Sequence, residues 1–165
     1  MFPWLAHGHI FPYLELSRRL LIRKNFHIYL CSTPINSTSI NTFIHNNNLS
    51  ESIEVVQLHL QPSHELPPHY HTTKNLPSHL AFTLIKAFQT AESSFSDIIT
   101  TLKPDLVILD ASNLRLPDLL LHKVFLLLTL PLLEQPRARI PITTAFFVIP
   151  TTTFRFKNCV LPMID

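Results

Sequence analysis

Glycine is nearly absent from this 165-residue sequence, in which Gly8 is the only one. Loops that bind nucleotide phosphates need several glycines, because their backbone turns tightly and approaches the phosphates closely. The chain therefore contains neither a P-loop nor a GxGxxG fingerprint. Any nucleotide phosphate would have to be held by another part of the protein.

Cysteine and charge are sparse as well. Cys31 and Cys159 lie far apart and form no CxxC pair, which argues against a disulfide scaffold or redox motif and favours a reducing, cytoplasmic setting. The 13 basic and 11 acidic residues are scattered singly, so we expect no nucleic-acid partner. No uninterrupted apolar run reaches the roughly 20 residues of a membrane-spanning helix, and no signal peptide is visible, so no membrane partner is expected.

Hydrophobic residues make up 46% of the chain, which is enough for one domain with a core. Strands that alternate with helices imply right-handed crossovers and a parallel sheet, so the pattern predicts an α/β fold. A long polar loop over residues 61–77 interrupts it, and beyond about residue 110 the pattern becomes irregular, with residues 111–139 unassigned. The predicted strands are residues 2–5, 26–31, 53–60, 106–109 and 145–149, and the predicted helices are the stretch after His9, 37–45 and 80–102.

Two titratable residues follow predicted strands. His9 comes after the first strand, in His7-Gly8-His9, where Gly8 is expected to allow a tight turn, and Asp110 comes after the fourth. The carboxyl ends of parallel strands line the crevice in which such folds bind ligands. If the two strands are neighbours, the pattern predicts an imidazole base oriented by a carboxylate. The alternative is that His9 caps a turn and Asp110 caps the next helix.

A second group of candidates lies in the long loop. His64, His69 and His71, with Glu65 as a possible fourth ligand, are close enough in sequence to suggest a zinc hydrolase. They lack the i, i+4 or CxxC spacing of known zinc motifs, so we expect no metal site.

Four stretches carry a resemblance to a known family. Residues 1–20 contain Gly-His-x-x-Pro ahead of an apolar helix, and residues 26–36, 65–73 and 104–110 agree with it. Together they resemble the plant UDP-dependent glycosyltransferases of family 1. The stretch 65–73 is most similar to members that extend an existing glycoside of a flavonoid or terpenoid.

The resemblance implies the N-terminal half of a GT-B fold, with a Rossmann-like parallel sheet and flanking helices. It implies an inverting transfer from a UDP-sugar, as donor substrate, to a hydroxyl of a small-molecule acceptor, without a metal or other cofactor. His9 matches the general base and Asp110 the acid that orients it. Acceptor binding would fall to Phe11, His69, Tyr70 and His71, although Phe11 could equally be helix-face core.

The family's UDP-sugar-binding domain has no counterpart in the sequence. Residues 1–165 are therefore expected to form a single, truncated acceptor-binding domain that does not catalyse transfer alone, since both substrates must be held together. Residues 111–133 do not resemble the family, which suggests a frameshifted or truncated gene copy. The alternative function is a non-catalytic remnant, at most an acceptor-binding module.

Overall fold

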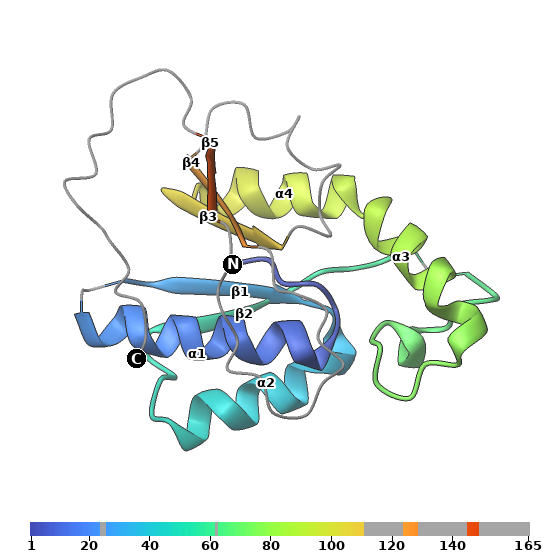
Figure 1. The fold of residues 1–165 in the computed structure, drawn as a ribbon, viewed down its shortest axis with the longest axis horizontal. Coiled ribbons are helices and arrows are strands. Elements are labelled where there is room, and N and C mark those ends of the chain that lie inside the picture. The colour runs from blue at the N-terminus through green and yellow to red at the C-terminus, as the bar shows by residue number, and fades with distance from the viewer. Residues whose placement is uncertain (24–25, 62, 111–123, 129–144, 149–165) are drawn as a thin grey trace.

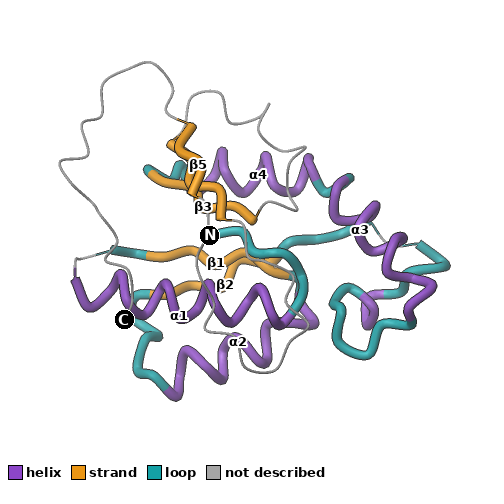
Figure 2. The backbone as a smooth tube through the Cα atoms, in the orientation of Figure 1, coloured by secondary structure: helices purple, strands orange, loops and turns teal. Residues whose placement is uncertain are grey.

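The computed structural model describes residues 1–23, 26–61, 63–110, 124–128 and 145–148. Helices and strands alternate along the chain as the sequence pattern predicted, in a layered arrangement (Figures 1 and 2). The helices are α1 (His7–Arg23), α2 (Pro34–Asn46), α3 (Ala81–Gln89) and α4 (Glu92–Leu102), with short 3-10 helices η1 (Pro68–Tyr70) and η2 (Ser78–Leu80), and the strands are β1 (Ile28–Ser32), β2 (Ile53–Gln57), β3 (Leu106–Asp110), β4 (Val124–Leu128) and β5 (Ala145–Val148).

The first two residues of the chain connect two groups of strands, one formed by β1 and β2 and the other by β3, β4 and β5. β1 pairs with β2 in parallel, and β3 pairs with β4 in parallel. Between β1 and β3, the Met1 amine donates to the Tyr29 carbonyl at 2.6 Å, and the Phe2 N–H donates to the Ile108 carbonyl at 2.8 Å. The predicted strand over 2–5 is reduced to a parallel bridge between Phe2 and Leu109. Pro3 has no N–H to continue the ladder, which explains why the pairing ends there.

α1 begins earlier than the sequence pattern predicted. Its first turn includes His7, Gly8 and His9, and the carbonyl of Ala6 accepts hydrogen bonds from the N–H groups of His9 and Ile10, both at 2.9 Å. Gly8 does not adopt a positive φ. The tight turn predicted at Gly8 is therefore wrong, because helical hydrogen bonds already hold the backbone at this position.

The helix predicted over residues 80–102 is also wrong as a single element. It is broken between α3 and α4, and Figure 1 shows the change of direction. The Thr90 hydroxyl donates to the Ala87 carbonyl at 3.0 Å, and the Ala91 N–H reaches back only three residues, to Phe88. A hydroxyl that bonds the preceding turn competes with the regular helical pattern.

Beyond Asp110 the structure describes only β4 and β5. The predicted strand over 145–149 is confirmed as β5, which runs antiparallel to β4, so this edge of the sheet is mixed. The rest of the unassigned segment 111–139 lies outside the described residues. No helix among the described residues is both long and apolar enough to span a membrane.

Helices cover both faces of the strands, and each face has its own core. Val107 and Leu109 of β3 belong to a cluster with Phe88 of α3 and Phe95 of α4. Ile108 points to the other face and belongs to a cluster with residues of α1, α2, β1 and β2. Since side chains alternate along a strand, Asp110 shares the face of Ile108, toward α1. The predicted α/β class with flanking helices is thus confirmed, and it directs Asp110 toward the helix that carries His9.

Candidate active site

The two predicted catalytic residues meet at one edge of the sheet. The Nδ1 atom of His9 lies 2.6 Å from the Oδ2 atom of Asp110, although 101 positions separate them in sequence. His9 belongs to the first turn of α1, and Asp110 is the last residue of β3, where its N–H donates to the Phe2 carbonyl. The Asp110 side chain is 2% exposed and the His9 side chain 13% exposed. Only the imidazole can therefore be reached from solvent.

This geometry determines which nitrogen of His9 is available. An ionised carboxylate can only accept hydrogen bonds, so Nδ1 carries a proton and donates it to Asp110. The lone pair then resides on Nε2, which can accept a proton from a substrate. The buried carboxylate would stabilise the positive charge that forms on the ring.

The backbone next to His9 leaves space for a substrate. Gly8 is exposed, and a Cβ atom placed on it would meet nothing within 4 Å. The space beside Gly8 is therefore open, although Gly8 is not needed for a turn.

A pocket of about 630 Å³ opens at the carboxyl ends of β1 and β2. Its size is within the range of small-molecule sites, and the described residues of its wall combine apolar side chains with imidazoles and include no carboxylate, lysine or arginine. Of the predicted acceptor residues, His69 and His71 line it, whereas Phe11 and Tyr70 do not. The lining residues are Pro34, Ile35, His59, Leu60, Pro68, His69 and His71.

Sequence reasoning missed His59, which was treated as an isolated histidine. It lies two residues beyond the end of β2, and its N–H contacts the Ser94 hydroxyl of α4 at 3.3 Å. Its place after a strand would have been the available signal, the same one that selected His9, but the end of the strand was predicted too late. The predicted strand ran on to residue 60 and hid this position.

Hydrogen bonds tie the loop of the pocket to the elements around His9. The Thr33 hydroxyl, between β1 and α2, donates to the His71 carbonyl at 2.6 Å. The Thr73 N–H donates to the carbonyl of Leu5 at 3.2 Å, two residues before α1. The pocket loop is therefore anchored close to the turn of α1 that carries His9.

His71 is held as a neutral ring. It is 6% exposed, and its Nε2 atom lies 3.2 Å from the Leu66 carbonyl, which makes Nε2–H the donor. Burial is the largest effect and lowers the pKa of His71, the hydrogen bond to the Leu66 carbonyl opposes this shift, and the neighbouring His69 lowers the pKa further. The His71 ring therefore stabilises the conformation of the loop and also lines the pocket.

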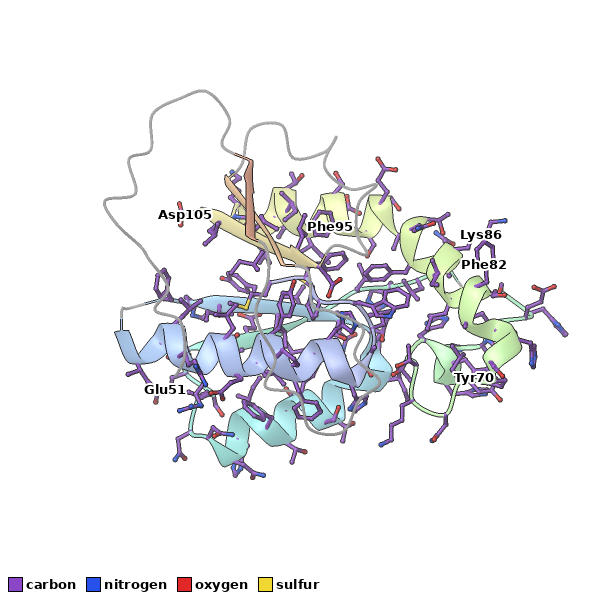
Figure 3. The ribbon with its side chains drawn as sticks, in the orientation of Figure 1. Glu51, Tyr70, Phe82, Lys86, Phe95 and Asp105 are labelled. Atoms are coloured by element: carbon purple, nitrogen blue, oxygen red, sulfur yellow. The ribbon has the colours of Figure 1, made fainter. Side chains whose placement is uncertain are left out.

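The two remaining predicted acceptor residues have other surroundings. The Tyr70 ring lies 4.2 Å from the ring of His69 and packs on the core near α3, at the side of the molecule where Figure 3 labels it. Phe11 is 41% exposed and contacts the rings of His7 and Phe43. The alternative that Phe11 is buried core is therefore wrong.

The zinc hypothesis finds no ligand set in the part of the chain that the structure describes. No group of three or more His, Cys, Asp or Glu side chains there is arranged to hold a metal ion. In particular, the Nε2 atom of His71 is directed at a backbone carbonyl.

No family model matches the chain. Individual plant enzymes do match it. The beta-D-glucosyl crocetin beta-1,6-glucosyltransferase of Gardenia jasminoides is 55% identical over 113 residues, which are 68% of this chain and 25% of that protein. The flavanone 7-O-glucoside 2''-O-beta-L-rhamnosyltransferase of Citrus maxima is 51% identical over 111 residues, 67% of this chain and 24% of that protein. Over this region the chain belongs to the plant UDP-dependent glycosyltransferases.

Solved structures of plant glycosyltransferases share the fold. Glycyrrhiza uralensis UGT73P12, complexed with glycyrrhetinic acid 3-O-monoglucuronide, superposes with a TM-score of 0.59 at 18% identity, over 66% of this chain and 22% of that one. Arabidopsis thaliana UGT89C1, complexed with UDP-L-rhamnose, gives a TM-score of 0.58 at 18% identity, over 68% of this chain and 29% of that one. The fold is thus the Rossmann-like, N-terminal part of a GT-B glycosyltransferase. The chain spans about a quarter of the length of the curated relatives that it matches.

Proposed function

We propose that this chain supplies the acceptor side of a UDP-sugar-dependent glycosyl transfer, as an acceptor-binding domain. The observation that carries the proposal is the 2.6 Å contact between His9 and Asp110. The pocket opens at the same edge of the sheet, but neither of these two residues lines it. A buried carboxylate that orients a partly exposed imidazole is the arrangement a general base requires.

In the proposed step, Nε2 of His9 accepts the proton of an acceptor hydroxyl as that oxygen attacks the anomeric carbon of the sugar. The bond from that carbon to UDP breaks, and UDP leaves with the bonding electrons. Attack on the face opposite UDP inverts the configuration. Asp110 stabilises the imidazolium until it loses its proton. The UDP-sugar is a substrate here, and no other cofactor is proposed.

We further propose that the acceptor is a glycoside of a flavonoid or terpenoid. The names of relatives support this class, since they specify a glucosyl crocetin and a flavanone 7-O-glucoside as acceptors. The pocket supports it as well, because Ile35 and Leu60 offer apolar surface for a ring system while imidazoles offer hydrogen bonds for hydroxyls.

We also propose a cytoplasmic location for the chain. A reducing compartment of this kind fits Cys31, which is buried and forms no disulfide.

A hybrid enzyme tests the role of His9. Residues 1–110 of this chain would replace the matching segment of the Gardenia jasminoides relative, and UDP release would be measured with a UDP-sugar and a flavonoid glucoside. We expect turnover by the hybrid and a loss of about 100-fold or more in His9→Ala. The matched control is His79→Ala, an exposed histidine outside the pocket. Equal activity of the His9→Ala hybrid would refute the proposal.

The second candidate is a binding module without turnover, which the limited overlap with the relatives favours. The 165-residue chain would be melted with and without a flavonoid glucoside. Binding to the folded chain must raise the melting temperature, and His69→Ala should abolish the increase. An acceptor that leaves the melting temperature unchanged at saturating concentration would exclude this role.

A further inference from the structure

Tyr13 is a buried residue whose polar group has no role in the fold described so far. It is 1% exposed, and among the described residues its hydroxyl has no hydrogen-bond partner. A buried hydroxyl without a partner costs free energy, and a phenylalanine would fill the same space without that cost. Such a group in the core calls for an explanation beyond packing.

The position of Tyr13 relates it directly to the catalytic pair. It follows His9 by four residues on α1, so both side chains lie on the same face of the helix, about 6 Å apart along its axis. Ile108 precedes Asp110 by two residues on β3, on the same face and about 6.6 Å away along the strand. Tyr13 and Ile108 belong to the same core cluster. His9 thus contacts Asp110 at the end of β3. Tyr13, one turn later on α1, packs on the same face of β3.

The phenol is a proton donor in the field of the carboxylate. Burial raises the pKa of Tyr13, and the negative charge of Asp110 raises it further, so the hydroxyl keeps its proton. Of the other titratable groups on the elements around this cluster, the Met1 amine and the Cys31 thiol are buried. Glu15 and Arg18 of α1 are half-buried and paired with each other, and Arg19, His27, His45 and Glu54 are exposed. Among these groups, Asp110 is the one whose charge acts on the phenol.

We propose that Tyr13 is a positioning residue for the His9–Asp110 pair. Its O–H dipole acts on the Asp110 carboxylate and favours the ionised form of that group. The same dipole weakens the hydrogen bond that the carboxylate accepts from the Nδ1 proton of His9. Tyr13 contacts no substrate and acts through Asp110. The catalytic consequence rests on the proposed function, whereas the electrostatic coupling between Tyr13 and Asp110 does not.

The first test uses the full 165-residue chain and the Tyr13→Phe variant, which removes one oxygen atom. Without the phenol dipole the carboxylate becomes the stronger acceptor, so the NMR resonance of the His9 Nδ1 proton should move downfield. Tyr29→Phe is the matched control, because it removes the same atom from β1, and it should leave the resonance in place. A resonance that does not move in Tyr13→Phe overturns the proposal. So does a fall in melting temperature with an unchanged resonance, which would indicate packing alone.

The second test uses the hybrid enzyme. It tests the role of Tyr13 even if the 165-residue chain gives no resolved NMR spectrum. Removal of a dipole that favours the ionised carboxylate makes the pair bind protons more tightly. The acid limb of the kcat/KM profile should therefore move to higher pH, by a few tenths of a unit, in Tyr13→Phe but not in Tyr29→Phe. An acid limb that stays in place or moves to lower pH contradicts the proposal. A hybrid that is indifferent to His9→Ala would instead refute the proposed function, while the resonance test of Tyr13 would still stand.

Discussion

At the residue scale, the proposed chemistry depends on which imidazole nitrogen of His9 carries the proton. The Asp110 carboxylate selects the form with the proton on Nδ1, because it can only accept a hydrogen bond. An amide in its place can offer a donor instead, which would select the form with the proton on Nε2 and remove the base. The identity of residue 110 is therefore as important as that of His9.

We accordingly expect Asp110→Asn to lower kcat/KM of the hybrid enzyme by about 100-fold or more, through the wrong ring tautomer. UDP release over a range of acceptor concentrations would measure this. Asp97→Asn is the control, because Asp97 is an exposed carboxylate on α4. Full activity of Asp110→Asn would mean that the carboxylate does not orient the base.

His71 makes the stability of the chain depend on pH. Burial lowers the pKa of His71 below its ordinary value of 6.5, so below that pH the unfolded chain binds a proton that the folded chain resists. The free energy of unfolding should therefore fall as the pH decreases from about 7 to 5. Urea melts of the chain and of His71→Gln should show a weaker pH dependence in the variant. His79→Gln should retain the dependence of the parent, and a variant as sensitive as the parent would contradict the assignment.

At the scale of elements, α1 positions the site because its first turn already includes His9. The sequence pattern identified this helix but placed a turn before it, since a glycine between two histidines is typical of a tight turn. The structure instead has helical backbone at Gly8, with free space where a side chain would lie. The hydrogen bonds to the Ala6 carbonyl decide this, and they involve only main-chain atoms that carry no sequence signal.

Gly8→Ala distinguishes the two descriptions. In helical backbone an alanine is favoured, so the free energy of unfolding should rise by up to about 1 kcal/mol. If Gly8 made a turn with positive φ, the same change would destabilise the chain. Urea denaturation of the parent and variant chains gives the sign directly. A loss of stability would instead support the tight turn that the sequence pattern predicted at Gly8.

At the scale of the whole molecule, the described residues contain the proposed acceptor-side base and a pocket, while the phosphates of a donor need further groups. The single glycine excludes a glycine-rich phosphate loop within this chain. The relatives extend over about four times the length that matches. Catalysis by positioning depends on both substrates being held at once.

We therefore expect the 165-residue chain by itself to release no UDP above the level of its His9→Ala variant. A coupled UDP-release assay with a UDP-sugar and a flavonoid glucoside would measure this, with the hybrid enzyme as positive control. Turnover by the chain that is lost in His9→Ala would show that these residues suffice for catalysis.

The sequence by itself determined the class of fold and the positions of the two proposed catalytic residues. Alternating apolar stretches specify strands and helices locally, and His9 and Asp110 could be found because each stands where a predicted strand ends. Only the tertiary structure decided that Phe2 pairs between β1 and β3, that His59 lines the pocket, and that Tyr13 shares a core cluster with Ile108 of β3. Hydrophobic periodicity is a property of neighbouring residues, whereas these contacts join residues far apart in the chain, and the order of strands in the sheet determines which of them meet.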